Sequence, residues 1–161
     1  MENQNADKKV LVTGASGGIG RAVAVEAAKE GYYVICHYNG NQAKAEETLA
    51  QIKANGGGGE IIKFDVSNRE DCKAKLDELT AKYGALWGVV NNAGITRDNT
   101  FVALSGEDWD KVIHTNLDSF YNVLNPLILS MASRKNKRGG RIITISSVSG
   151  VDGNRGQTNY S

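Results

Sequence analysis

The chain has 161 residues, 40% of them hydrophobic, and a formal net charge of +1. This length suits one domain with a buried core over residues 1–161, and the charge is too small to attract nucleic acid or a membrane surface. No apolar run approaches the roughly 18 residues of a membrane span, and the first residues lack the apolar segment of a secretory signal. We therefore expect a cytoplasmic protein with no membrane or nucleic-acid partner, and flexible residues 1–8.

The first predicted elements are a strand at 9–13, a glycine-rich turn and a helix. The turn reads TGASGGIG at 13–20, and a second strand follows at 33–38. Closely spaced glycines let the backbone approach a pyrophosphate, and the following helix directs free amide groups at the anion. Many such turns bind nothing, but here the turn sits inside a strand–helix–strand unit. The predicted ligand is a dinucleotide.

Strand-like and helix-like segments alternate along the whole chain, which favours a doubly wound parallel sheet with helices on both faces. The predicted strands lie at 9–13, 33–38, 60–64, 87–91 and 140–146. Cys36 falls in a strand pattern and Cys72 in a helix pattern, without metal-ligand or redox-motif spacing. We expect two structural thiols and no metal site.

Two capping boxes mark helix starts, one at Ser67 with Glu70 and one at Ser105 with Asp108. The second box precedes a long helix. The predicted buried stripe of that helix consists of Ile113, Leu117, Phe120, Leu124, Leu127 and Met131.

Five ordered motifs resemble the short-chain dehydrogenase/reductase family. They are TGASGGIG at 13–20, NNAG at 91–94, Asn116 in the long helix, Ser147 after the fifth strand, and Tyr160 thirteen residues later. Longer strings, NNAGITRDNTF and GGRIITISSVSG, are similar to the 3-oxoacyl-[acyl-carrier-protein] reductases and their acetoacetyl-CoA reductase relatives. The resemblance implies a Rossmann fold with strand order 3-2-1-4-5. It also implies reduction of a 3-oxoacyl thioester by NADPH.

Ketone reduction needs a hydride from the nicotinamide and a proton for the developing alkoxide. The resemblance makes Tyr160 the acid, gives Ser147 a second hydrogen bond to the same substrate oxygen, and gives the Asn116 backbone a water of the proton relay. Ser146 and Ser149 are alternatives on composition, and the thirteen-residue offset selects Ser147. Without the resemblance, the tyrosine would be a half-buried aromatic residue and the serines turn formers.

The resemblance also assigns the cofactor contacts. The turn would face the pyrophosphate, two residues after the third strand the adenine, and three residues after the fourth strand the nicotinamide ribose. The predicted set is Gly14, Ala15, Ser16, Gly17, Gly18, Ile19, Gly20, Asn39, Asp65, Val66, Asn92, Ala93 and Gly94. Asp65 has an alternative role as a turn residue ahead of Ser67.

The choice between NAD and NADP depends on the end of the second strand, where an acidic side chain would repel a 2′-phosphate. The residues from His37 to Gly40 include no acid, which favours NADPH over NAD. Relatives often carry an arginine where this chain has Gly17, so one expected phosphate partner is missing. Arg21 or His37 is the candidate substitute.

A basic run precedes the fifth strand and consists of Arg134, Lys135, Lys137, Arg138 and Arg141. In the resembled reductases a basic surface here receives the acyl carrier protein, and Arg138 occupies the matching position. Cations at the end of a helix are also favoured by its dipole alone. Both interpretations stay open.

The family pattern places a lysine four residues after the tyrosine, at position 164, and the chain ends at Ser161. That lysine lowers the tyrosine pKa, and a shift from about 10 toward neutrality needs roughly 4 kcal/mol. The family's later strands and helices are also missing. We expect the N-terminal part of a longer, homo-oligomeric (tetrameric) reductase. The alternatives are a dinucleotide-binding module without turnover and a short-chain reductase of another ketone or alcohol.

Overall fold

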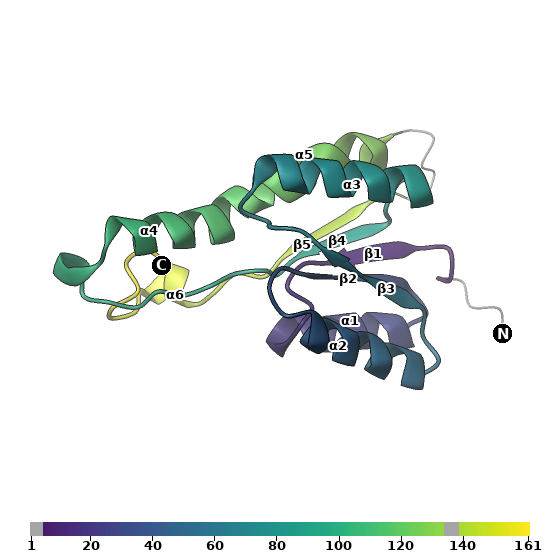
Figure 1. Cartoon of the computed structure of the whole chain (residues 1–161), viewed down its shortest axis with the longest axis horizontal. Helices are drawn as coiled ribbons and strands as arrows, with labels where there is room; N and C mark the ends of the chain where they lie inside the picture. Colours follow the sequence, from purple (N-terminus) through teal and green to yellow (C-terminus); the bar gives the residue numbers. More distant parts are fainter. Residues whose placement is uncertain (1–4, 134–138) are drawn as a thin grey trace.

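The computed structural model describes residues 5–133 and 139–161, and its centre is a five-stranded parallel sheet (Figure 1). The strands are β1 (Lys9–Val12), β2 (Tyr33–Tyr38), β3 (Gly59–Lys63), β4 (Gly88–Asn91) and β5 (Arg141–Thr144). Their order across the sheet is β3-β2-β1-β4-β5, which confirms the predicted order. From β1 to β3 each new strand is added on one side of β1, whereas β4 and β5 are added on its other side, so the strand order reverses between β1 and β4. In parallel sheets of this kind, ligands bind outside the carboxyl ends of the strands at such a switch point.

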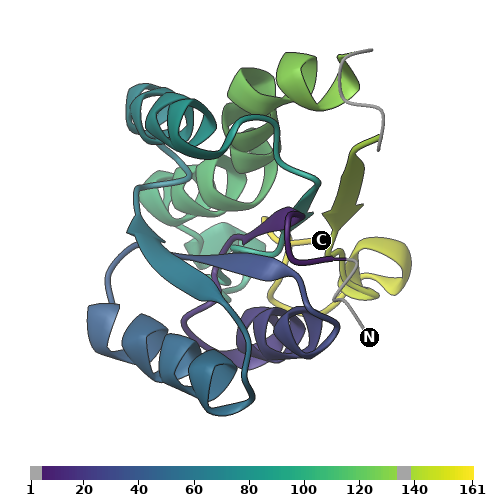
Figure 2. The ribbon, with the colours of Figure 1, turned by 90° about the vertical axis from the view of Figure 1, so that its right-hand side faces the viewer.

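Helices cover both faces of the sheet, as the alternating pattern predicts. They are α1 (Gly18–Lys29), α2 (Gln42–Ala54), α3 (Arg69–Tyr83), η1 (Phe101–Ala103), α4 (Gly106–Ile113), the π-helical turn η2 (His114–Asp118), α5 (Ser119–Ala132) and α6 (Ser149–Asp152). Figures 1 and 2 show α1 and α2 on one face and α3 and α5 on the other. In Figure 1, α4 extends beyond the sheet, with α6 and the end of the chain beside it.

The side chains of the strands pack into two hydrophobic cores, one on each face of the sheet, because successive side chains of a strand point to opposite faces. Leu11, Ile35 and Val89 belong to the core that also contains Leu76 of α3 and Leu127 of α5. The strand residues between them face the core that contains buried residues of α1 and α2. The strand residues of this second core are Val10, Val12, Val34, Cys36 and Val90.

The start of α3 differs by one residue from the prediction. The predicted capping box placed Ser67 at the N-cap, and this is wrong. Asn68 is the N-cap, and its side chain accepts a hydrogen bond from the Asp71 amide (3.0 Å). Asparagine and serine are comparably good caps, so the pattern did not distinguish the two neighbours. The second capping box is confirmed, since Ser105 Oγ accepts from the Asp108 amide at the start of α4 (3.1 Å).

A π-helical turn shifts the buried face of the long helix. The predicted stripe includes Leu117 and Phe120, but their exposed fractions are 65% and 47%. In η2 the hydrogen bonds span five residues instead of four, so one extra residue enters the turn and the faces before and after it lose their common register. Leu124, Leu127 and Met131, which follow the turn, are buried as predicted.

Both cysteines, Cys36 and Cys72, are free and buried, and burial raises the pKa of each thiol to about 12. Within residues 5–133 and 139–161, no cluster of His, Cys, Asp and Glu could hold a metal ion. The helices of the same ranges are all too short or too polar to cross a bilayer. The predicted flexibility of residues 1–8 concerns four residues outside the described ranges. Asn5 to Lys8 form a turn closed by a bond from Lys8 N to Asn5 O (2.8 Å).

Candidate active site

The glycine-rich turn between β1 and α1 lies closer to the end of β4 than side chains would allow. Gly14 has a φ of +67°, and a Cβ there would stand 3.0 Å from both Ala93 Cα and Asn92 Nδ2. A Cβ on Gly20 would overlap the carbonyl oxygen of Gly14. Glycine is therefore required at both positions.

The N-terminus of α1 has the features of an anion site. Gly17 is the N-cap residue, and no side chain caps this helix. Uncapped amides and the positive end of the helix dipole attract a phosphate group. The first exposed side chain of the helix, Ile19, lines the neighbouring cavity. The turn and helix therefore fit the pyrophosphate of a dinucleotide.

Thr13 joins this turn to the residues that follow β4. Its Oγ1 accepts hydrogen bonds from the amides of Asn92 and Ala93, both at 2.9 Å. In return, Asn92 Nδ2 donates to the Thr13 carbonyl oxygen (2.9 Å). These bonds hold Asn92, Ala93 and Gly94 at the switch point, where the resemblance places the nicotinamide ribose. Sequence reasoning missed Thr13, because its partners lie 79 and 80 residues away.

Neither candidate substitute for an arginine in the turn is free to bind a phosphate. His37 is 1% exposed, and both of its ring nitrogens have backbone partners. The interpretation that His37 contacts a 2′-phosphate is therefore wrong. Arg21 donates to the Ser16 carbonyl oxygen (2.9 Å) and to Thr48 Oγ1 (3.0 Å), and it pairs with Glu47 (3.0 Å). Its guanidinium braces the turn from the side of α2.

The predicted adenine contacts follow the carboxyl ends of β2 and β3. Asp65 Oδ1 accepts hydrogen bonds from Ser67 N (2.9 Å) and Ser67 Oγ (2.7 Å). Its carboxylate therefore serves the turn before α3, which is the alternative role considered for it. Val66 is buried, and Asn39 after β2 is exposed. Their contact with adenine stays a prediction.

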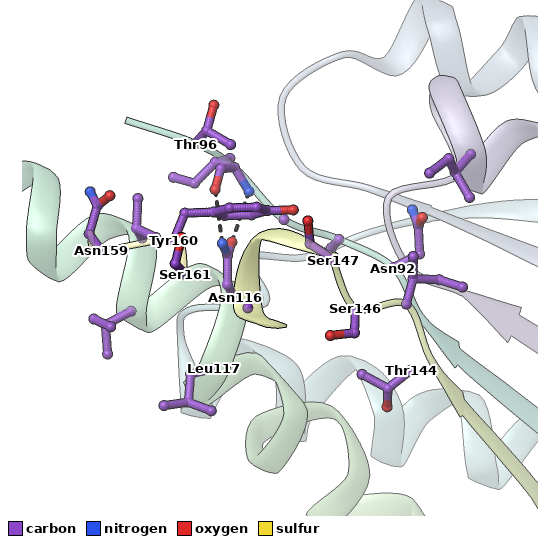
Figure 3. A pocket seen from close by; sticks show the side chains of 18 residues that line it. Asn92, Thr96, Asn116, Leu117, Thr144, Ser146, Ser147, Asn159, Tyr160 and Ser161 are labelled. Atoms are coloured by element: carbon purple, nitrogen blue, oxygen red, sulfur yellow. Dashed lines mark hydrogen bonds between the residues drawn. The ribbon is translucent and has the colours of Figure 1, made fainter. Parts of the chain in front are cut away.

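Asn116 lies in the π-helical turn and faces the loop after β4. Its Oδ1 accepts from Ile95 N (2.8 Å), and its Nδ2 donates to Ile95 O (2.9 Å), as the dashed lines in Figure 3 show. A Cβ on Gly94 would stand 3.2 Å from Asn116 Oδ1. The side chain is thus occupied with holding the loop. Its backbone is the part left for the water that the resemblance implies.

Ser147 and Tyr160 line one cavity of about 760 Å³, together with Asn116. Figure 3 shows the hydroxyl end of Tyr160 directed toward Ser147. Ser147 Oγ accepts from the Ser149 amide (3.2 Å), which leaves its own proton for another acceptor. Ser146 also lines the cavity, whereas Ser149 does not. The structure therefore brings together the three residues that the resemblance named as catalytic.

The same cavity reaches both the cofactor turn and an apolar wall. Its lining includes Ile19 of α1 and the residues from Asn92 to Gly94. It also includes the apolar residues Val112, Ile113 and Leu117. Its polar hydroxyls and amides thus adjoin a surface suited to an aliphatic group.

Two polar residues that sequence reasoning missed hold the segment carrying Tyr160. Gln157 Nε2 donates to Asp98 Oδ2 (2.9 Å), and its carbonyl oxygen accepts from the Tyr160 amide (3.0 Å). Asn159 is 5% exposed, and its Nδ2 donates to the Arg97 carbonyl oxygen (3.1 Å). The only signal in the sequence is a run of turn-forming residues, which does not name distant partners.

The predicted carrier-protein contact, Arg138, lies outside the described residues, as do Arg134, Lys135 and Lys137. The last residue of the basic run, Arg141, starts β5, and its guanidinium lies 5.8 Å from the centre of the Trp87 ring. The docking prediction for Arg138 therefore stays a prediction.

A comparison with known families bears on the whole chain. The family model described as "short chain dehydrogenase" matches residues 8–161. The chain belongs to this family. The predicted family resemblance is confirmed, and the roles of Asn116, Ser147 and Tyr160 stay predictions.

Individual relatives are similar over most of this chain. A protein of Aggregatibacter actinomycetemcomitans named 3-oxoacyl-[acyl-carrier-protein] reductase FabG is 46% identical over 152 residues, which are 94% of this chain and 62% of that protein. The protein of that name from Staphylococcus aureus strain Mu50 is 43% identical over 153 residues, 95% of this chain and 61% of its own length. Nodulation protein G of Azospirillum brasilense is 44% identical over 156 residues, 97% and 62% of the two chains. The chain spans about three fifths of the length of these relatives.

Proposed function

We propose that this protein reduces a 3-oxoacyl thioester to the 3-hydroxyacyl thioester in the cytoplasm, with NADPH as the hydride donor. The observation that carries the proposal is the single cavity that Tyr160 and Ser147 line together with the residues after β4. The apolar side of the cavity suits an acyl chain. The curated relatives named 3-oxoacyl-[acyl-carrier-protein] reductase support this substrate class.

The chemistry needs a hydride at the carbonyl carbon and a proton at the carbonyl oxygen. The bound dinucleotide supplies the hydride. Ser147 Oγ donates a hydrogen bond to the carbonyl oxygen and so orients it, and Tyr160 transfers its phenolic proton to that oxygen as the carbon is reduced. The phenolate that remains takes a proton back from solvent. Asn116, by fixing Ile95, keeps the floor of the site in place.

A paired assay tests the proposal, with acetoacetyl-CoA as the probe. NADPH fluorescence measures binding, and the loss of NADPH absorbance measures turnover. We expect both binding and oxidation from the full-length protein, which in the family pattern includes the lysine that lowers the tyrosine pKa. If NADPH binds but none of the ketones tested oxidises it, the result would favour a dinucleotide-binding module. Oxidation with other ketones but not with acetoacetyl-CoA would reassign the substrate.

The preference for NADPH over NAD rests on the residues from His37 to Gly40, which include no acidic side chain to repel a 2′-phosphate. The side chains of His37 and Arg21 are bonded to other groups of the protein, so neither is available to a 2′-phosphate, and we expect a moderate preference for NADPH. We expect NADPH to bind more tightly than NADH in the fluorescence titration. Tighter binding of NADH would overturn this choice.

We also propose a homo-oligomer, a tetramer at full length, and an acyl carrier protein as the substrate donor. The names of the curated relatives support the carrier protein. The support for the oligomer is an exposed apolar surface on η2 and α5. Its residues are Leu117, Phe120, Tyr121, Ile128 and Leu129. Large exposed apolar patches mark interaction surfaces. Sedimentation of the wild type beside Leu129→Lys, a residue 82% exposed, should give an assembly that the variant weakens. Sedimentation of both proteins as monomers would contradict the oligomer.

A further inference from the structure

His37 is a polar residue in the hydrophobic interior of β2. It is 1% exposed, and its ring packs against Phe64 with 4.0 Å between centroids. The strand residues before it, Val34, Ile35 and Cys36, are apolar and fully buried. Burying an imidazole among them is unfavourable unless both ring nitrogens are satisfied. The identity of its partners therefore shows what the ring does.

Both partners are backbone groups, and together they fix the tautomer. Gly14 N–H donates to His37 Nδ1 (3.0 Å), and His37 Nε2 lies 2.9 Å from the Phe64 carbonyl oxygen. An N–H group can only donate and a carbonyl oxygen can only accept. Nδ1 must therefore be bare, and Nε2 must carry the proton.

The ring is neutral at physiological pH, which this tautomer requires. Burial lowers the pKa of the His37 imidazole to about 4, although the bond to Phe64 and the charges of Asp65 and Asp71 raise it. A doubly protonated ring would turn an N–H toward the N–H of Gly14. The neutral state keeps Nδ1 as an acceptor.

The residue holds two consecutive amides of the glycine-rich turn. Besides the bond from Gly14 to the ring, the Ala15 amide donates to the His37 carbonyl oxygen (2.9 Å). On the opposite side, Asn92 Nδ2 donates to the carbonyl oxygen of Thr13 (2.9 Å) and lies 3.4 Å from that of Gly14. These hydrogen bonds hold Gly14 between β2 and the end of β4, in its left-handed conformation.

The conformation of Gly14 decides where the amide groups of the following residues point. The backbone leaves Ala15 and enters α1 at Gly18, with the uncapped N-cap Gly17 between them. A rotation at Gly14 would change the direction of every following N–H group. Those amides are the groups that an anion at the helix N-terminus requires.

We propose that His37 is a positioning residue for the dinucleotide: as the Nε2–H tautomer it holds the Gly14 amide and thereby aims the amides of the turn at the pyrophosphate. The proposal rests on the proposed dinucleotide binding. His37 contacts the turn and not the cofactor.

Two variants that each keep one of the ring's bonds separate positioning from stability. His37→Asn offers Oδ1 near the place of Nδ1 and gives up the bond to Phe64. His37→Gln reaches toward Phe64 and leaves Gly14 N–H without an acceptor. His37→Leu removes both bonds at similar volume. We expect NADPH to bind about tenfold more weakly to the Gln and Leu variants and within about threefold of wild type to the Asn variant. All three should melt at lower temperature than wild type.

A role confined to stability predicts a different outcome. The melting temperature would fall in all three variants, and the Kd for NADPH of the folded protein would stay at the wild-type value. That result would overturn the proposal. So would a Kd for His37→Asn that rises as far as the Kd for His37→Gln.

A second measurement needs no cofactor. The chain has two histidines, His37 and His114. A two-bond ¹H–¹⁵N spectrum of the labelled protein, assigned with His114→Gln, reports the protonation of each ring nitrogen. We expect a proton on His37 Nε2 alone and slow exchange of the Gly14 amide. A proton on Nδ1 would overturn the proposal, because Nδ1 could then not accept from the Gly14 amide.

The two readouts distinguish the proposals from each other. If the wild type binds neither NADPH nor NADH, the proposed function fails. The tautomer of His37 and the exchange rate of the Gly14 amide in His37→Gln then still test whether the ring holds that amide. If the wild type binds NADPH and His37→Leu binds it equally well, the positioning role of His37 fails and the proposed function stands.

Discussion

Asn116 and Ile95 exchange two hydrogen bonds, at 2.8 Å and 2.9 Å, across the floor of the candidate active site. This pair joins the π-helical turn to the loop after β4. A side chain that satisfies both backbone polar groups of one loop residue restricts the conformation of that loop. Asn116 lies within η2, so the π-helical turn carries the side chain that holds the loop.

Replacing Asn116 with leucine should release this loop. Both Ile95 groups lose their partner, so we expect the free energy of unfolding to fall by about 1–3 kcal/mol and ketone reduction to fall with it. Thermal or urea unfolding measures the first effect. Asn116→Asp separates the two bonds, because its Oδ atoms still accept from Ile95 N but cannot donate to Ile95 O. If the leucine variant is as stable as wild type, the pair does not hold the loop.

Gly20→Ala should damage the turn, although alanine is the better helix former. The added methyl group would overlap the Gly14 carbonyl oxygen and stand 2.5 Å from Asn92 Nδ2. We expect a loss of about 1–3 kcal/mol in unfolding free energy and weaker NADPH binding. Gly106→Ala, where a Cβ meets nothing within 4 Å, is the control and should leave both quantities near wild type. Equal behaviour of the two variants would contradict the close approach.

Gly17→Arg should raise the preference for NADPH. Gly17 has φ −177° and ψ 179°, an extended conformation open to any residue, and a Cβ there meets nothing within 4 Å. The family pattern carries an arginine in the turn at this position, and a guanidinium–phosphate bond is charge-assisted. We expect the Kd for NADPH to fall about tenfold while the Kd for NADH changes little. Gly17→Gln controls for side-chain bulk, and an equal gain for both cofactors would refute the phosphate contact.

His37 should make the protein less stable as the pH falls from 6.5 toward 4. Burial lowers the pKa of the native imidazole to about 4, so in this range the unfolded chain binds a proton that the native state does not. The contribution to the unfolding free energy is constant well above pH 6.5, and its full loss, reached below pH 4, is roughly 3 kcal/mol. Urea unfolding across this range, for wild type and His37→Asn, isolates it from the carboxylates. Parallel pH profiles for the two proteins would show that His37 does not titrate in this way.

The sheet and the site motifs could be predicted because their signals are local. Apolar strands and glycine turns indicate the alternating strands and helices of a parallel sheet. The strand order and the roles of Ser147 and Tyr160 come from the family resemblance of the ordered motifs. The exposed faces of Leu117 and Phe120 could not be predicted, since a π-helical turn breaks the period on which stripe predictions depend.

The role of His37 was hidden for a different reason. Its ring partners, Gly14 and Phe64, lie 23 and 27 residues away. From the sequence, a histidine at a strand end looked available to a phosphate. No local pattern reports that the ring is buried against Phe64 and bonded to the protein backbone. The same limit applies to Thr13, whose partners Asn92 and Ala93 follow β4, 79 and 80 residues along the chain.

The central claim is that Tyr160 and Ser147 act on one carbonyl oxygen beside the cofactor turn. The most direct test measures acetoacetyl-CoA reduction and NADPH binding in the same samples of wild type, Tyr160→Phe and Ser147→Ala, with Tyr121→Phe as the control, a tyrosine 52% exposed. The account predicts that kcat falls at least about 100-fold in the first two variants, with NADPH binding within about threefold of wild type and no loss in the control. Wild-type kcat in Tyr160→Phe would contradict it.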